Sequence, residues 1–82
     1  MNKIKVLFFA TLRDRAGIKS TELEIPADMT VQGLKDLLVE SYPGLQETMD
    51  VVVVSVNREF AFDEGIVPEG AEVAMFPPVS GG

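Results

Sequence analysis

Two stretches decide the fold, KIKVLFFA at residues 3–10 and AEVAMF at residues 71–76. In the first, apolar residues take every second position from Ile4 to Phe8, as in a strand with one buried face. The alternation fades at residues 7–9, where both faces of the strand are apolar. A covering helix explains one apolar face, so the other face needs a second cover or forms a docking patch.

A second strand and one helix are predicted between these stretches. Residues 21–25 alternate again and stop at Pro26, so they are expected to form a hairpin with the first strand across a polar turn at residues 13–19. Thr30 is a suitable N-cap for a helix of about twelve residues that Pro43-Gly44 ends. The apolar face of this helix consists of residues at helical spacing, namely Val31, Leu34, Leu37 and Leu38.

Further strands are predicted after the helix. Residues 46–50 are expected to be irregular, and VVVVSV at residues 51–56 is rich in β-branched residues, as a central strand would be. A turn at residues 57–59 and a short strand at residues 60–62 follow, and further turns lead to the last strand.

The order strand, strand, helix, strand, short strand, strand predicts an α+β fold of the β-grasp (ubiquitin-like) class. A mixed four- to five-stranded sheet would pack on one main helix. The first and last strands are the most apolar, so they are expected to lie side by side as parallel central strands. The 82 residues suit one small domain. Residues 1–76 are expected to form this domain, with residues 77–82 as a flexible C-terminal Gly-Gly tail.

The composition excludes most side-chain chemistry. The chain has no cysteine and no histidine, which excludes disulfides, thiol catalysis and the commonest metal ligand. The carboxylate pairs Glu22 with Glu24 and Asp63 with Glu64 are expected to be solvated surface charge. We therefore expect no metal site, no bound cofactor and no catalytic activity of the chain on its own.

The net charge of −6 argues against nucleic acids and anionic membranes as partners. The first 19 residues hold five cations and one carboxylate, whereas the rest hold Lys35 and Arg58 against twelve carboxylates. This uneven charge distribution either keeps the protein soluble or steers the protein toward a basic surface on a partner. No apolar run reaches the roughly 20 residues of a membrane span, and the amino-terminal stretch lacks the features of a signal peptide. A cytoplasmic location is the default expectation.

The sequence FPPVSGG at residues 76–82 holds the most plausible reactive group. Pro77-Pro78 removes backbone donors and fixes φ, so it ends sheet pairing and projects the tail. Gly81 and Gly82 lack a Cβ and fit a slot too narrow for other residues. A free carboxylate at Gly82 becomes reactive after adenylation by ATP, and attack by a sulfur donor then yields a thiocarboxylate. The competing interpretation is a frayed terminus.

The opening IKVLFFA, with Leu12-Arg13 and Gly17 after it, resembles the small subunit of molybdopterin synthase, the MoaD-type sulfur carrier. The ending GAEVAMFPPVSGG at residues 70–82 is similar to that family's ending. The resemblance extends over essentially the whole chain. A Gly-Gly ending alone is shared by all ubiquitin-like carriers, whereas its combination with Phe-Pro-Pro and the Phe-Phe-Ala opening is much more specific.

The resemblance implies that an E1-like adenylyltransferase activates Gly82 with ATP and that a sulfur donor system converts it to a thiocarboxylate. The thiocarboxylate then donates sulfur to cyclic pyranopterin monophosphate, in a complex of two small and two large catalytic subunits. The resemblance also assigns residues for tail insertion into the large subunit, namely Pro77, Pro78, Val79, Ser80 and Gly81. It assigns the partner interface to Phe9, Arg13, Phe60 and Phe76, although a core role for the phenylalanines stays open.

Three alternatives to molybdopterin synthesis remain at this point. Carriers for thiamine, cysteine or tRNA thiolation use the same chemistry, but they usually lack the Phe-Pro-Pro element. A ubiquitin-like protein modifier would use the same activated carboxylate to join a lysine. A purely structural ubiquitin-like module would not need its terminus at all.

Overall fold

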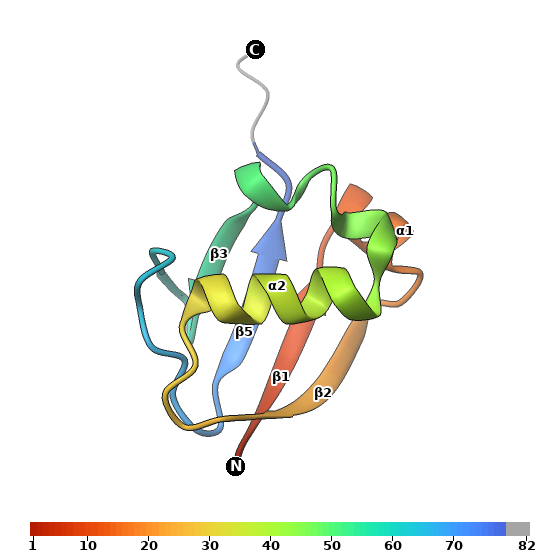
Figure 1. Ribbon diagram of the computed structural model, residues 1–82. Helices are drawn as coiled ribbons and strands as arrows, with labels where there is room; N and C mark the ends of the chain where they lie inside the picture. Colours follow the sequence, from red (N-terminus) through yellow and green to blue (C-terminus); the bar gives the residue numbers. More distant parts are fainter. Residues whose placement is uncertain (79–82) are drawn as a thin grey trace.

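The computed structural model describes residues 1–78 of the 82-residue chain. Within this range one five-stranded sheet has the strand order β2-β1-β5-β3-β4. Figure 1 shows the sheet with helix α2 crossing one of its faces. The strands are β1 (Asn2–Phe8), β2 (Ser20–Ile25), β3 (Val53–Val56), β4 (Glu59–Phe60) and β5 (Glu72–Phe76).

The pairing of the strands confirms the predicted β-grasp. Strands β1 and β5 are parallel neighbours, and β5 occupies the centre of the sheet. Strand β1 pairs with β2, and β3 pairs with β5 and β4, in antiparallel fashion. The sheet is therefore mixed. Its observed strands differ from the predicted ones by a few residues at their ends, and β4 stops at Phe60 instead of Phe62.

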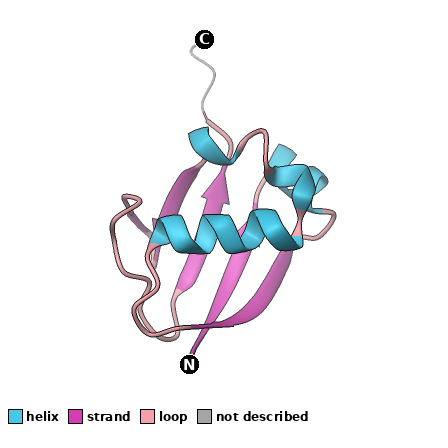
Figure 2. Cartoon of the chain, in the orientation of Figure 1, coloured by secondary structure: helices cyan, strands magenta, loops and turns pink. Residues whose placement is uncertain are grey.

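Helix α2 (Val31–Ser41) is the main helix and covers the inner face of the sheet (Figure 2). The predicted N-cap is confirmed, because the Thr30 hydroxyl oxygen accepts a hydrogen bond of 3.0 Å from the backbone N–H of Gly33. Val31, Leu34 and Leu38 are fully buried. They pack in one core cluster with the inner-face residues of β1 and β5, which accounts for the burial of every second residue in β1. In β5, three successive residues are buried, namely Val73, Ala74 and Met75.

The predicted polar turn at residues 13–19 is wrong, because the chain forms helix α1 (Thr11–Ala16) here. Leu12 lies on the buried side of α1 and is 1% exposed. Gly17 ends the helix in the left-handed conformation, with a φ of 82°, and donates its N–H to the Arg13 carbonyl. Burial of Leu12 stabilises a helix that is too short to be stable alone.

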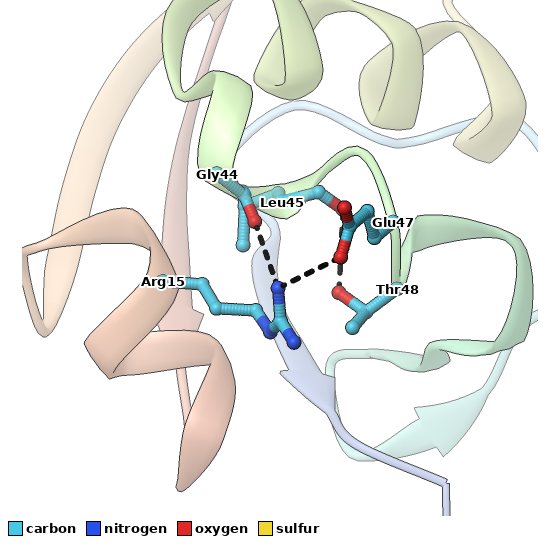
Figure 3. Close-up of polar contacts among 5 residues, drawn as sticks. All are labelled: Arg15, Gly44, Leu45, Glu47 and Thr48. Atoms are coloured by element: carbon cyan, nitrogen blue, oxygen red, sulfur yellow. Dashed lines mark hydrogen bonds and ion pairs between the residues drawn. The ribbon is translucent and has the colours of Figure 1, made fainter.

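Two 3₁₀ turns, η1 (Pro43–Leu45) and η2 (Met49–Val51), connect α2 to β3. Arg15 of α1 reaches η1, where its Nη1 donates to the Gly44 carbonyl at 3.4 Å and lies 3.8 Å from a carboxylate oxygen of Glu47 (Figure 3). A Cβ at Gly44 would lie 2.5 Å from the backbone oxygen of Arg15, so this approach needs glycine. The docked turn η1 therefore lies where Pro43-Gly44 was predicted to end the helix, and the region predicted as irregular, residues 46–50, contains the start of η2.

Lys35 is the buried cation of the described residues, and it pairs with Asp63, which is exposed as expected. Its Nζ lies 2.8 Å from a carboxylate oxygen of Asp63, and the Lys35 side chain is 7% exposed against 48% for Asp63. The carbonyls of Asp63 and Gly65 also accept hydrogen bonds from the first turn of α2. An ion pair and two backbone hydrogen bonds therefore hold the loop after β4 against the start of helix α2.

We predict unequal effects when the two partners of this ion pair are removed. Asp63→Ala leaves the Lys35 ammonium buried without its partner and is expected to cost about 1–3 kcal/mol of unfolding free energy. Lys35→Met leaves a largely solvated carboxylate and an apolar side chain of similar length, so it is expected to cost less than about 1 kcal/mol. Urea unfolding of both variants measures the difference. Equal losses would contradict the asymmetry.

Candidate functional site

The candidate site is the outer face of the sheet, opposite α2. The register aligns Leu7 with Ala74, Ala74 with Ser55, and Ser55 with Phe60, so these residues form one row across four strands. Since side chains alternate between the two faces of a strand, Phe9 and Phe76 lie in the next row toward the end of β5. The two rings are stacked, with centroids 4.8 Å apart and planes inclined by 10°.

The backbone holds Phe9 in this position. Its N–H donates to the Met75 carbonyl at 3.1 Å, which extends the pairing of β1 with β5 by one residue. Ala10 then adopts a φ of 53°, which is unusual for a residue other than glycine, and turns the chain into α1. This turn leaves Phe9 on the outer face while Leu12 enters the core.

The three phenylalanines assigned by the resemblance lie together on this face and do not belong to the core. Phe9 is 42% exposed, Phe60 is 81% exposed and Phe76 is half-buried. We call the group that they form with their apolar neighbours the apolar face; its members are Leu7, Phe9, Val53, Phe60, Ala74, Phe76 and Pro77. A contiguous exposed patch of this kind is typical of a protein-interaction site.

Two hollows divide the apolar face, with the three phenylalanines lining both. The tail-side hollow has a volume of about 590 Å³, and Ala10, Val53 and Pro77 complete its walls. The central hollow has a volume of about 320 Å³. It extends from the phenylalanines to Arg58 and Glu72. Both hollows are open and mostly apolar, which suits the side chains of a docking protein.

The tail begins at this face. Pro77 is half-buried at the edge of the tail-side hollow and Pro78 is exposed. The remaining residues assigned to tail insertion, and the reactive group at Gly82, lie outside the described residues. Their roles stay predictions.

Arg13 lies on α1, exposed, at one end of the face. It lines a shallow depression together with Phe9 and Lys19. The structure thus places all four predicted interface residues around one surface, with Arg13 and Lys19 as a cationic border. Whether a partner binds there is a prediction that these positions leave untested.

Among residues 1–78 no three acidic side chains come close enough to hold a metal ion. No helix in the same range is long and apolar enough to cross a membrane.

Four residues that line the two hollows were not named among the predicted interface residues, namely Leu7, Val53, Ser55 and Ala74. Leu7 was detectable, because it breaks the alternation of β1. The other three are ordinary strand residues, and only the register brings them beside the phenylalanines.

The fold and the exposed apolar face beside the tail define a ubiquitin-like β-grasp protein. The ThiS family model matches residues 6–82, and the chain belongs to this family. The molybdopterin synthase sulfur carrier subunit of Arabidopsis thaliana is 40% identical over 80 residues, covering 98% of this chain and 83% of the relative.

Solved structures show the same fold. The small archaeal modifier protein 1 of Haloferax volcanii is 31% identical with a TM-score of 0.86, covering 99% of this chain and 100% of the other. A complex of subunits 1 and 2 of the molybdopterin-converting factor from Helicobacter pylori contains a chain that matches with a TM-score of 0.68 at 18% identity. That match covers 98% of this chain and 99% of the other and supports the fold alone.

Proposed function

We propose that this protein is the sulfur carrier subunit of molybdopterin synthase and works in the biosynthesis of the molybdenum cofactor. Membership of the ThiS family and the identity to a molybdopterin synthase sulfur carrier subunit support this role. The observation that carries the docking part of the proposal is the stacked pair of the exposed Phe9 and the half-buried Phe76, beside Pro77 at the start of the tail.

The chemistry belongs to the carboxylate of Gly82. An oxygen of this carboxylate attacks the α-phosphate of ATP on an E1-like adenylyltransferase, forming the acyl-adenylate and releasing pyrophosphate. A sulfur nucleophile from the donor system then displaces AMP and leaves a thiocarboxylate. Its sulfur passes to cyclic pyranopterin monophosphate, and water restores the carboxylate. The chain supplies the reactive end and no catalytic side chain.

The partner that consumes the sulfur is the large catalytic subunit of the synthase. We propose that it covers the apolar face and receives the tail from Pro77 onward, in a heterotetramer of two small and two large subunits. Desolvation of three aromatic rings would supply the main binding energy. Activation by ATP agrees with a cytoplasmic location.

A second function, as a protein modifier, is favoured by one specific observation. The chain is 31% identical to a small archaeal modifier protein over nearly its full length. In that case a lysine amine replaces the sulfur nucleophile and the acyl-adenylate ends as an isopeptide bond. The two functions share activation and differ in the product.

Intact-mass spectrometry after incubation with the adenylyltransferase, ATP and a sulfur donor tests the proposal. We expect the mass to rise by the difference between sulfur and oxygen, and iodoacetamide to add one alkyl group. Because the chain has no cysteine, this alkylation reports the thiocarboxylate without background. A reaction without ATP is the control. An unchanged mass would refute sulfur loading, and a large isopeptide adduct formed in cells would favour the modifier.

A further inference from the structure

The central hollow exists because two short side chains lie between longer ones. Ala74 and Ser55 are aligned neighbours on β5 and β3 and form its floor. Phe60 continues the same row on the next strand, and the stacked Phe9 and Phe76 rise beside it. Ala74 is only 8% exposed, so the longer side chains around it cover most of its surface.

The walls determine what the hollow accepts. The three aromatic rings bound one end, and Arg58 with Glu72 bound the other. Arg58 and Glu72 have opposite charges and no ion-pair contact between them within the described residues. Their charges balance, so the hollow selects for apolar surface and neither sign of charge is favoured inside it. No polar side-chain atom is buried without a hydrogen-bond partner in residues 1–78, so the hollow presents no buried, unpaired polar group to a ligand.

We propose that the central hollow is a socket for one large apolar side chain of the large catalytic subunit. Ser55 and Ala74 are specificity-determining residues, because their small size keeps the socket open. The inference rests on the proposed function, since it places this socket inside the docking surface. A buried anchor in a pocket that excludes water is the usual centre of binding energy in an interface.

A second copy of this chain is the other conceivable occupant, with its Phe60 as the inserted side chain. The charge of the protein opposes this arrangement. Each copy carries a net charge of −6, so two copies repel each other, whereas a partner with a basic surface is attracted.

The proposal is tested by replacing Ser55, on the floor of the socket, with a larger residue that fills the socket. Ser55→Ile places a β-branched side chain between Ala74 and Phe60, and strand β3 accepts such a residue readily. We expect thermal stability to be unchanged or higher and the Kd for the large subunit to rise about tenfold or more. Ser55→Ala keeps the socket open and should bind like the wild type.

The matched control is Ser20→Ile. Ser20 is aligned with Leu7 in the same row of the same face, but it lies on the edge strand β2 and does not line the hollow. Isothermal titration calorimetry with the purified large subunit should give a wild-type Kd for this variant.

Each remaining outcome overturns a defined statement. Wild-type binding by Ser55→Ile refutes the socket and leaves the proposed function intact. Equal weakening by Ser20→Ile refutes the socket, because added bulk anywhere on the face would then explain the loss. If the wild-type protein itself fails to bind the large subunit, the proposed function fails and the socket with it. If the free protein sediments as a dimer that Ser55→Ile dissociates, the occupant is a second copy and our assignment is wrong.

Discussion

Deletion of Gly82, or extension of the chain beyond it, is expected to abolish sulfur transfer while leaving the fold unchanged. Under the proposed function the reacting carbonyl must belong to a glycine whose neighbour is also a glycine, since a side chain would block its approach to the adenylylating site. Extension turns the carboxylate of Gly82 into an amide, which ATP cannot adenylate in this way. Sulfur transfer is measured as molybdopterin formed with the large subunit.

Stability and docking are the controls for this prediction. The core cluster is built from residues of the described range, up to Met75, so the variants should unfold at the wild-type temperature. They should also still bind the large subunit, because the apolar face is intact. Ser80→Ala changes the tail without touching the glycines and should retain activity. A truncated protein that still supports molybdopterin formation would contradict the carrier mechanism.

The fold was predictable because its decisive signals are local. Alternation in the first strand, the β-branched run before Ser55, and the Thr30 cap are each legible within a few residues. Their order then leaves few topologies in which a single helix covers the sheet. Apolar composition alone correctly paired the first and last strands as parallel neighbours. Only β5 is buried on both faces, at Val73, Ala74 and Met75, whereas the outer face of β1 exposes Lys3 and Lys5.

The errors arose where local signals were short or where distant residues decided the structure. Helix α1 has six residues, which are too few to show a periodic apolar pattern. The one sequence feature that indicated this helix was Gly17, which is its C-cap. Four consecutive valines suggested one strand, but the first of them belongs to a 3₁₀ turn. The pairing of Lys35 with Asp63 joins segments far apart in the sequence, so no local rule predicts it.

The candidate site was predictable in part for the same reason. Phe9 was recognisable because it broke an alternating pattern, and the resemblance assigned Phe60 and Phe76. The hollow between them depends on the register of β3 against β5, which places Ser55 beside Ala74. Register is a property of paired strands, and a single strand's sequence does not determine it.

Phe60→Asp is expected to weaken binding of the large subunit by about a hundredfold, equivalent to about 2.7 kcal/mol, with little effect on the fold. The Phe60 ring is 81% exposed, so its removal costs the free protein little. In the proposed complex the ring is desolvated among the other aromatic residues, and a carboxylate there would be buried without a partner.

Phe62→Asp is a closely matched control for this variant. Phe62 lies two residues away, is 79% exposed and receives the same substitution, but it lines neither hollow of the apolar face. Both variants add the same negative charge at positions two residues apart in the chain, so general repulsion would weaken both alike. Specific docking through the apolar face predicts near wild-type binding for Phe62→Asp. It also predicts that Phe60→Asp transfers sulfur poorly at low concentrations of the variant protein and normally when this protein is in excess over the large subunit. Equal losses, or a defect in Phe60→Asp that persists at saturating carrier, would show that the face does not act through docking.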